Sequence, residues 1–389
     1  MMEPMGEWKR TNTCGELDLE DIGRDVILMG WVHSRRDLGG LIFVDLRDRE
    51  GITQLVFDPQ ADKETYNKAK GLKDEYVIAV KGQVSRRLKG QENLDLKTGR
   101  IEVKAKELRI LNTSYLPPFQ IYGAVDGSET LRLRYRYLEM RRHDVMSIFR
   151  LRHRIGSFIR GYLDKKGFIE VETPFLTKST PEGARDYLVP SRINKGKFYA
   201  LPQSPQLFKQ ILMVAGFDKY YQIVRCFRDE DLRADRQPEF TQVDVEMSFV
   251  DENEIMRLFD EMMKELFREI MGHEISVPIP RLEYKEAMDR FGSDKPDTRF
   301  GMELKDITDI AKETGFKIFQ DIVSGGGIVK AIVVKNASLS RKELDNLSEE
   351  AKQYGAKGIF WAKVTKDEWQ SSIKKYIDEK KKKEINRRL

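Results

Sequence analysis

The chain is poor in cysteine and lacks long apolar runs, and both features restrict where it works. Its two cysteines, Cys14 and Cys226, lie far apart, with no CxxC spacing to indicate zinc and no disulfide framework. Residues 1–10 lack the apolar core of a signal peptide, and no run of about 18 or more apolar residues is present to span a membrane. We therefore expect a cytoplasmic protein without membrane association.

Several catalytic motifs are missing as well. There is no G-x-G-x-x-G after a strand and no G-x-x-x-x-G-K-[ST], which excludes the dinucleotide-binding and P-loop routes to nucleotide binding. G-x-S-x-G and H-E-x-x-H are also missing, and the 4 histidines are scattered. Any nucleotide chemistry must then depend on positioned charges rather than on a histidine base. Such chemistry suits attack of an ionised carboxylate on an α-phosphate.

Length and charge set broader limits. The 389 residues are enough for about two to four domains, and contents of 40% hydrophobic and 34% charged residues are typical of a soluble globular protein. The net charge is only +5, from 69 basic and 64 acidic residues. Local clusters, rather than the overall charge, must therefore carry any case for a polyanionic partner.

The N-terminal part predicts an OB barrel. Three strands, a helix and two more strands follow one another at 26–33, 41–47, 52–57, 62–70, 76–85 and 101–108. In OB barrels the face of the second and third strands commonly binds single-stranded nucleic acid. Phe43 would there be a stacking ring among basic side chains, which are Arg35, Arg36, Arg47 and Arg49. The alternative is that Phe43 belongs to the barrel core and that the arginines pair with Asp37, Asp45 and Asp48.

The middle of the chain predicts a hinge and then a long helix. Residues 111–131 show little periodicity, and the arginines from Arg132 to Arg142 are more typical of an ion-paired solvent face than of a nucleic-acid contact. Apolar residues recur at helical spacing over 145–166. Short strands are expected at 168–171 and 198–201.

A second helix is expected after Ser204-Pro205, which has the form of an N-cap followed by proline. Gln206 and Lys209 would share one face of it, because they are three residues apart. Ser204 is a cap in the simplest interpretation, and a site residue in the alternative.

The C-terminal part differs in character from about residue 299. Strands are expected at 315–319, 327–335 and 357–364, and a helix at 341–353 opened by a capping box of Ser340 and Glu343. A final helix should run from about 367 to the end, with the lysines at 380–383 as a solvated helix end.

The stretch with the most chemistry is a hairpin at 225–244, two strands joined by a turn rich in arginine. Strand alternation puts Arg228 and Glu230 on one side of the first strand. One side of the second strand is polar and aromatic, with Phe240, Gln242 and Asp244, and the other is apolar, with Thr241, Val243, Val245 and Met247. A nucleotide-binding sheet surface needs such a face, and an amphipathic hairpin with a solvated outer face is the alternative.

In order along the chain, these motifs resemble those of bacterial-type aspartyl-tRNA synthetases, class II ligases with an N-terminal OB anticodon-binding domain. The long helix with 168–174 resembles motif 1, which forms much of the homodimer interface in the family, and 227–230 with the strand through Asp244 resembles motif 2. The segment 180–191 resembles the mobile loop over the amino acid, and 203–209 the aspartate-binding segment. The C-terminal part resembles the start of the bacterial insertion domain.

The resemblance implies a multi-domain fold and an activity. The fold is an all-β OB barrel at 1–111, a hinge at 112–140, the N-terminal part of an α+β class II antiparallel sheet with helices at 141–298, and an incomplete α+β insertion domain at 299–389. The activity is ATP-dependent ligation of L-aspartate to tRNA(Asp) through aspartyl-adenylate. The implied partners are ATP, Mg²⁺, tRNA(Asp) and a second copy of the chain bound through the motif 1 region.

The resemblance also implies roles for single residues. Arg228 and Glu230 are the catalytic candidates, Arg228 on the α-phosphate and Phe240 stacked on adenine. The ATP-binding set is Arg228, Glu230, Gln237, Phe240 and Gln242. The aspartate-binding set is Glu182, Ser204, Gln206, Lys209 and Asp244, of which Lys209 reaches the side-chain carboxylate. The anticodon-binding set is Arg36, Phe43, Gln54 and Glu102.

One departure from the family is large. Nothing after Asp244 resembles motif 3, and the family's Mg²⁺ carboxylates and the arginine that clamps the aspartate side chain are also missing. We therefore expect a truncated chain that holds no metal site and does not adenylate aspartate at a useful rate by itself. The alternatives are a non-catalytic tRNA-binding module and an asparaginyl- or lysyl-tRNA synthetase. The loop at 180–191, Lys209 and the domain from 299 argue against the last two.

Overall fold

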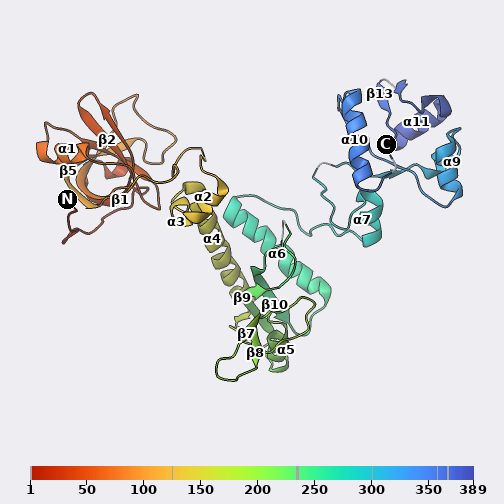
Figure 1. Ribbon diagram of the computed structural model, residues 1–389, viewed down its shortest axis with the longest axis horizontal. Coiled ribbons are helices and arrows are strands. Elements are labelled where there is room, and N and C mark those ends of the chain that lie inside the picture. Colours follow the sequence, from red (N-terminus) through yellow and green to blue (C-terminus); the bar gives the residue numbers. More distant parts are fainter. Residues whose placement is uncertain (1, 125, 234–235, 300, 357, 366–367) are drawn as a thin grey trace. The chain divides into compact units, whose positions relative to one another are not determined.

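The computed structural model describes residues 2–389 apart from 125, 234–235, 300, 357 and 366–367. The chain forms two compact units, Met1–Ser276 and Val277–Leu389, and each is described by itself (Figure 1). Among the described residues, no helix has the length and apolar character that a membrane crossing needs. The domain boundaries given above stay a prediction.

The predicted OB barrel is confirmed. After the 3-10 turn η1 (Leu19–Asp21), a closed barrel contains β1 (Asp25–Leu38), β2 (Leu41–Arg47), β3 (Ile52–Phe57), β5 (Ile101–Asn112) and β4 (Val77–Arg86) in spatial order, and α1 (Lys63–Lys70) follows β3.

Alternation along β2 decides where Phe43 lies. Ile42, Val44 and Leu46 point inward and are fully buried, so Phe43 faces outward and is half-buried. The alternative that Phe43 is a core residue is therefore wrong. Arg47, expected among the basic residues around Phe43, is instead buried and ion-paired to Glu75 at 2.7 Å.

The linker after the barrel contains α2 (Glu129–Arg134) and α3 (Arg136–Glu139). Its arginines are largely ion-paired. Glu139 binds Arg132 at 2.6 Å and also binds Arg136, while Arg141 binds Glu75 at 2.7 Å. This pairing confirms the ion-paired interpretation of the arginine cluster.

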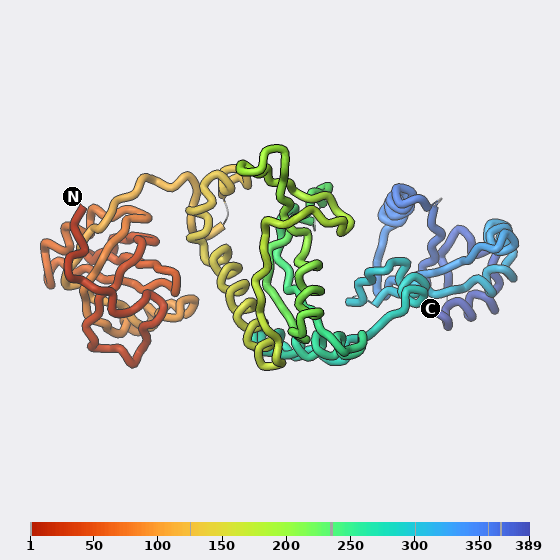
Figure 2. Tube along the Cα trace, turned by 90° about the horizontal axis from the view of Figure 1, so that it is seen from below, coloured from red at the N-terminus to blue at the C-terminus, as the bar shows by residue number. Residues whose placement is uncertain are grey.

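The sheet with the polar hairpin has the order β10–β9–β6, from β10 (Glu239–Met247), β9 (Lys219–Phe227) and β6 (Ile169–Glu170). One face packs on α4 (His143–Lys165) and α6 (Glu252–Met271), and Figure 2 shows α4 running alongside the strands. The core between them includes Leu163, Tyr221 and Met262 together with Val243 and Val245 of β10. The apolar face predicted for β10 is confirmed, and the polar face lies on the opposite side.

Shorter elements complete this part. β7 (Leu188–Pro190) pairs with β8 (Phe198–Ala200), and α5 (Gln206–Val214) follows. The N-cap position of α5 belongs to Pro205, so the prediction of Ser204 as the cap is wrong. The Ser204 hydroxyl instead donates to the Glu182 carboxylate in the preceding loop at 2.8 Å.

The second unit has small sheets and short helices. They are α7 (Tyr284–Phe291), β11 (Lys305–Asp306), α8 (Thr308–Lys312), α9 (Lys317–Ser324), β12 (Lys330–Ala331), α10 (Arg341–Gln353), β13 (Lys363–Thr365), β14 (Glu368–Gln370), η2 (Lys374–Tyr376) and α11 (Glu379–Arg388). The capping box of Ser340 and Glu343 forms as predicted.

Several secondary-structure predictions for this unit are wrong. Where strands were expected at 327–335 and 357–364, the described residues form only β12 (Lys330–Ala331) and β13 (Lys363–Thr365). The strand expected at 315–319 overlaps α9, because Phe319 and Val323 recur at helical spacing and face the core. The final helix begins only at α11, after its N-cap Asp378, since β14 and η2 come first. Residues 357 and 366–367, where a strand and that helix were expected to begin, lie outside the described residues.

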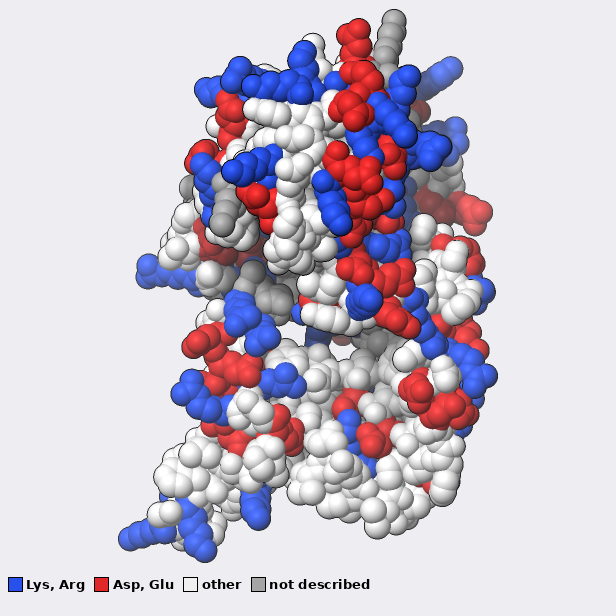
Figure 3. All heavy atoms as spheres, turned by 90° about the vertical axis from the view of Figure 1, so that its right-hand side faces the viewer, with Lys and Arg blue, Asp and Glu red and all other residues white. Residues whose placement is uncertain are grey.

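The lysine run lies in α11, where Lys381 pairs with Glu313 and Lys382 pairs with Glu379 at 2.6 Å. Figure 3 shows basic and acidic side chains interspersed over the face in view. Lys380 and Lys383 are exposed, as expected for a solvated helix end, but the side chains of Lys381 and Lys382 are only 15% and 11% exposed, so the prediction holds for part of the run.

Candidate functional site

The hairpin of β9 and β10 brings a guanidinium and a ring together. Phe240 lies opposite Cys226 in the ladder, and the Arg228 N–H donates to the Pro238 carbonyl at 2.9 Å, so the two side chains share one face. The Arg228 Cζ lies 5.0 Å from the centre of the Phe240 ring. Both side chains are half-buried. A phosphate-binding group thus lies beside a flat stacking surface.

The rest of the predicted ATP-binding set is more open. Glu230 is exposed and its carboxylate binds Arg236 at 3.4 Å, and Gln237 is exposed next to it. Gln242 lies on the same face as Phe240, and its Oε1 accepts from the Cys226 thiol at 3.3 Å. Ala234 and Asp235 in the arginine-rich turn lie outside the described residues.

An ion pair lies further along the same face, between β10 and α5. Lys209 Nζ lies 3.0 Å from Asp244 Oδ1 and 3.3 Å from Glu246 Oε2. Desolvation alone would lower the pKa of Lys209, but the two carboxylates outweigh it and raise that pKa. An ammonium has three donors, so Lys209 keeps one for another acceptor. Gln206, one turn earlier on α5, is half-buried.

Asp244 has capacity for a further hydrogen bond. The residue is 9% exposed, and Oδ2 is buried with no hydrogen-bond partner among the described residues. Burial raises its pKa, which the Lys209 ion pair offsets only in part, and the nearby charges of Glu246 and Glu182 raise it further. A buried acceptor beside other carboxylates is suited to binding a cation such as an ammonium.

The loop before β7 brings Glu182 to this site. Both of its carboxylate oxygens accept hydroxyl hydrogen bonds, from Thr180 at 3.1 Å and from Ser204 at 2.8 Å. A cavity of about 140 Å³ has Glu182, Ser204 and Leu207 among its lining residues. All five predicted aspartate-binding residues therefore lie on α5, β10 or the loop beside them, while the roles assigned to them stay predictions.

On the barrel, the four predicted anticodon residues share one outer face. Arg36 lies opposite Phe43 and donates to Gln54 Oε1 at 3.3 Å, and Gln54 donates to Glu102 at 3.1 Å. Arg36 also pairs with Asp45 at 3.0 Å. Burial raises the pKa of Glu102, against the opposing effects of Gln54 and Arg87. The side chains thus form a connected polar surface beside an outward aromatic ring.

Sequence analysis missed Arg87, which borders this surface. Its side chain is 6% exposed, its Nε donates to the Ile101 carbonyl at 2.9 Å, and its Nη2 is buried without a partner in the described part of the chain. Burial lowers its pKa, opposed by the charges of Asp45 and Glu102. The residue lies just past the predicted end of the fourth strand, so strand alternation gave no signal for it.

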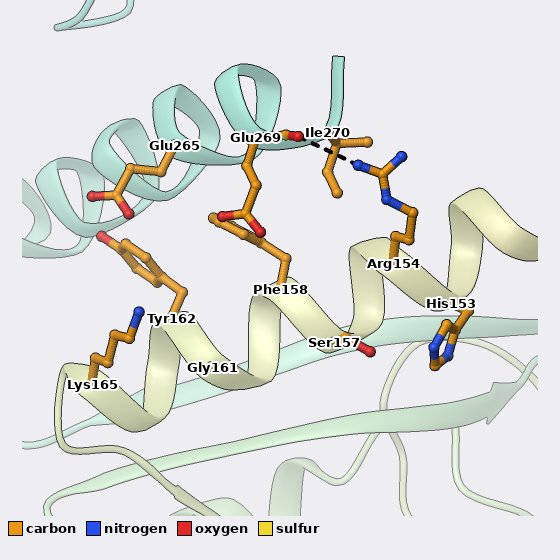
Figure 4. A pocket seen from close by; sticks show the side chains of 10 residues that line it. All are labelled: His153, Arg154, Ser157, Phe158, Gly161, Tyr162, Lys165, Glu265, Glu269 and Ile270. Carbon is orange, nitrogen blue, oxygen red and sulfur yellow. Dashed lines mark hydrogen bonds between the residues drawn. The ribbon is translucent and has the colours of Figure 1, made fainter. Parts of the chain in front are cut away.

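A larger cavity of about 340 Å³ lies between α4 and α6 (Figure 4). Its lining is of mixed charge, with Arg154 and Lys165 from α4 against Glu265 and Glu269 from α6. These helices cover the apolar face of the sheet, so the cavity is separate from the face of Arg228 and Phe240. Among the described residues, no three His, Cys, Asp or Glu side chains gather so as to hold a metal ion, so no step is assigned to Mg²⁺.

Comparison with known proteins decides the family. Residues 128–385 match the model of the class II tRNA synthetases (D, K and N). The chain belongs to this family of class II synthetases. Residues 26–111 match the OB-fold nucleic acid binding domain. The resemblance seen in the motifs is thus confirmed, and so is the predicted fold class.

Among curated relatives of this class II synthetase, the aspartate–tRNA(Asp/Asn) ligase of Syntrophotalea carbinolica is 57% identical over 98% of the chain, and that of Oleidesulfovibrio alaskensis is 56% identical over 97%. The chain spans 64% and 62% of their respective lengths.

Solved structures agree on the fold. The asparaginyl-tRNA synthetase of Pyrococcus horikoshii, complexed with asparaginyl-adenylate, has a TM-score of 0.60 at 23% identity, covering 93% of this chain and 79% of that one. The Entamoeba histolytica asparaginyl-tRNA synthetase, also with asparaginyl-adenylate, has a TM-score of 0.59 at 21% identity, covering 68% of this chain and 62% of that one. At these identities the likeness is one of fold.

Proposed function

We propose that this class II synthetase chain serves ATP-dependent ligation of L-aspartate to tRNA(Asp) through an aspartyl-adenylate. The observation that carries the proposal is the Arg228 guanidinium 5.0 Å from the centre of the Phe240 ring, on the same sheet face as the Lys209–Asp244 pair. Base, phosphate and amino acid would then lie along one surface.

The chemistry of activation suits these residues. The α-carboxylate of aspartate attacks the α-phosphorus of ATP, an O–P bond forms, and the bond to pyrophosphate breaks. The nucleophile is already ionised, so no histidine base is needed. Arg228 would stabilise the charge that gathers on the α-phosphate oxygens, and Phe240 would hold the adenine in place. Glu230, Gln237 and Gln242 would contact the rest of ATP.

The second half of the surface fits an amino acid with an acidic side chain. Glu182, Gln206 and Oδ2 of Asp244, which has no partner in the described part of the chain, would accept hydrogen bonds from the substrate ammonium. Lys209 would direct its remaining donor to the side-chain carboxylate. Ser204 would keep Glu182 in position through the hydrogen bond already present.

The barrel would bind the tRNA anticodon. Phe43 would stack on one base, and Arg36, Gln54 and Glu102 would bond to base edges, since unstacked bases are read by stacking and by hydrogen bonds. The relatives' names extend their substrates to tRNA(Asn). Binding of this chain should therefore be measured with both tRNAs.

Calorimetric titration with L-aspartate, L-asparagine and L-lysine tests the amino acid. We expect aspartate to bind at least about tenfold more tightly than the other two. The buried ammonium of Lys209 forms a charge-assisted hydrogen bond with a side-chain carboxylate, which asparagine and lysine lack. Gln206→Ala should weaken aspartate binding about fivefold, since it removes one hydrogen bond. Gln210→Ala, exposed on the same helix, is the control and should leave binding unchanged.

Tighter binding of asparagine or lysine would overturn the assignment within the family. A chain that binds tRNA but none of the three amino acids would be a tRNA-binding module instead. The expectation that these 389 residues do not adenylate aspartate at a useful rate stays a prediction, and aspartate-dependent pyrophosphate exchange measures it.

A further inference from the structure

Gln203 is buried beside the proposed aspartate pocket and belongs to none of the predicted binding sets. It lies between β8 and α5, and its side chain is 3% exposed. A buried amide must satisfy its donors and acceptor within the protein. The partners of this amide therefore indicate what the residue does.

All of its hydrogen bonds go to the loop that carries Glu182. Gln203 Oε1 accepts from the Ala184 N–H at 3.0 Å, and Nε2 donates to the Ala184 carbonyl at 2.8 Å and to Asp186 Oδ1 at 2.5 Å. The amide thus reproduces, for one residue, the pair of bonds that a neighbouring strand would make. Both Nε2 hydrogens are used, which fixes the orientation of the amide.

The next residue makes the second contact to the same loop. Ser204 donates to Glu182 at 2.8 Å, two positions before Ala184. Gly183 lies between these contacts with φ of +106°, a backbone conformation that favours glycine, so the loop turns sharply there. The other carboxylate oxygen of Asp186, Oδ2, accepts a hydrogen bond from the Ser179 hydroxyl at 2.6 Å. Two consecutive residues, Gln203 and Ser204, therefore clamp the loop beside α5.

We propose that Gln203 is a positioning residue, which holds Glu182 in the aspartate pocket by pairing with Ala184. The inference rests on the proposed function, because the pocket is assigned to aspartate there. Without the amide, the Ala184 backbone exchanges its buried partner for water, the loop opens, and Glu182 leaves the neighbourhood of Asp244. The bonds of Gln203 involve neither Arg228 nor Phe240, and the loop keeps a separate backbone bond, from the Asp229 N–H to the Arg185 carbonyl at 3.0 Å.

Gln203→Met tests this, because methionine has similar size and cannot make the three bonds. Hydrogen exchange over 180–186 should speed up about tenfold or more, since several net hydrogen bonds are lost. Aspartate affinity should fall by a similar factor while ATP affinity stays within about twofold. The control is Gln210→Met on the exposed side of α5, which should change neither.

A double variant separates positioning from general destabilisation. In a Glu182→Ala background, Gln203→Met should cause no further loss of aspartate affinity, because its effect passes through Glu182. A further loss of about tenfold would overturn the inference, as would unchanged exchange over 180–186 in the single variant. Gln203→Glu, which keeps the acceptor but not the donors, should resemble Gln203→Met and serves if that variant does not fold.

The two proposals fail in distinguishable ways. If the unaltered chain binds no aspartate, the proposed function fails, and the loop exchange alone decides whether Gln203 holds this segment. If aspartate binds but Gln203→Met leaves hydrogen exchange over 180–186 unchanged, only the inference fails.

Discussion

At the scale of single residues, the site depends on charges that are buried together. The side chains of Lys209 and Asp244 are 12% and 10% exposed in their ion pair. Breaking a buried pair from one side is strongly destabilising, because it leaves an uncompensated charge. The pair therefore fixes α5 against β10, in addition to the ligand-binding role proposed for it.

Asp244→Asn makes the burial of this carboxylate measurable as a function of pH. Because its folded pKa is raised above the ordinary 3.8, its contribution to stability is greatest at acid pH and is lost as pH rises through the folded value. The variant lacks this loss. Its unfolding free energy, relative to the unaltered chain, should therefore increase between about pH 4 and pH 7 in urea denaturation.

Lys209 stays charged over that range. The loss of its partner therefore lowers the unfolding free energy of the variant by the same amount at each pH and does not change its dependence on pH. A relative stability that falls as pH rises would show that the folded pKa of Asp244 is lowered instead.

Alternation predicted which residues of 225–244 share a face, because the period of a strand is two. It could not predict that Lys209 reaches Asp244, since the two residues are far apart in sequence and meet only when α5 packs on β10. Nor could it assign Gln203, whose three bonds depend on the path of a loop. The pattern predicted that Arg228 and Phe240 are site residues, but it could not predict that they lie 5.0 Å apart.

At the scale of elements, long periodic segments were predictable and short ones were not. The helix expected at 145–166 corresponds to α4 (His143–Lys165), and the capping box fixed the start of α10 at Arg341. The five-residue window 315–319 fitted a strand as well as a helix. The helix prevails because Phe319 packs edge-on against Phe316, with ring centres 5.0 Å apart, inside the second unit.

The resemblance to motif 1 predicts a homodimer, and α4 has exposed apolar residues that such an interface would use. Ile148 and Leu151, three residues apart and therefore on one side of α4, are 64% and 43% exposed, and a partner copy would cover them. Ile148→Asp should lower the measured mass from dimer to monomer in sedimentation at micromolar concentration, because a charge cannot be buried there unpaired. Ile193→Asp, at a position 89% exposed in the turn between β7 and β8, should leave the mass unchanged.

A monomeric unaltered chain, or a dimer that tolerates Ile148→Asp, would contradict the assignment of α4 to the interface.

At the scale of the whole molecule, the proposed function would divide recognition between two parts of the chain. The barrel has an outward ring within a polar network, which the proposal assigns to unstacked bases, and the sheet has a ring, a guanidinium and a buried carboxylate, which it assigns to ATP and aspartate. The chain spans 64% of the length of its relative from Syntrophotalea carbinolica, so the activity of the whole protein remains a proposal.

The central claim is that Arg228 and Phe240 bind the phosphate and the base of one ATP molecule. Titration with ATP and with adenosine tests it directly in three variants. Arg228→Ala should weaken ATP binding at least about tenfold and leave the affinity for adenosine unchanged, because only ATP has phosphates. Phe240→Ala should weaken both by a similar factor, through lost stacking.

The control is Arg225→Ala, on the opposite face of β9 and paired with Glu239 at 3.0 Å, which should alter neither affinity. An Arg228→Ala chain that binds ATP as tightly as the unaltered chain, or a Phe240→Ala chain that keeps its adenosine affinity, would contradict the account.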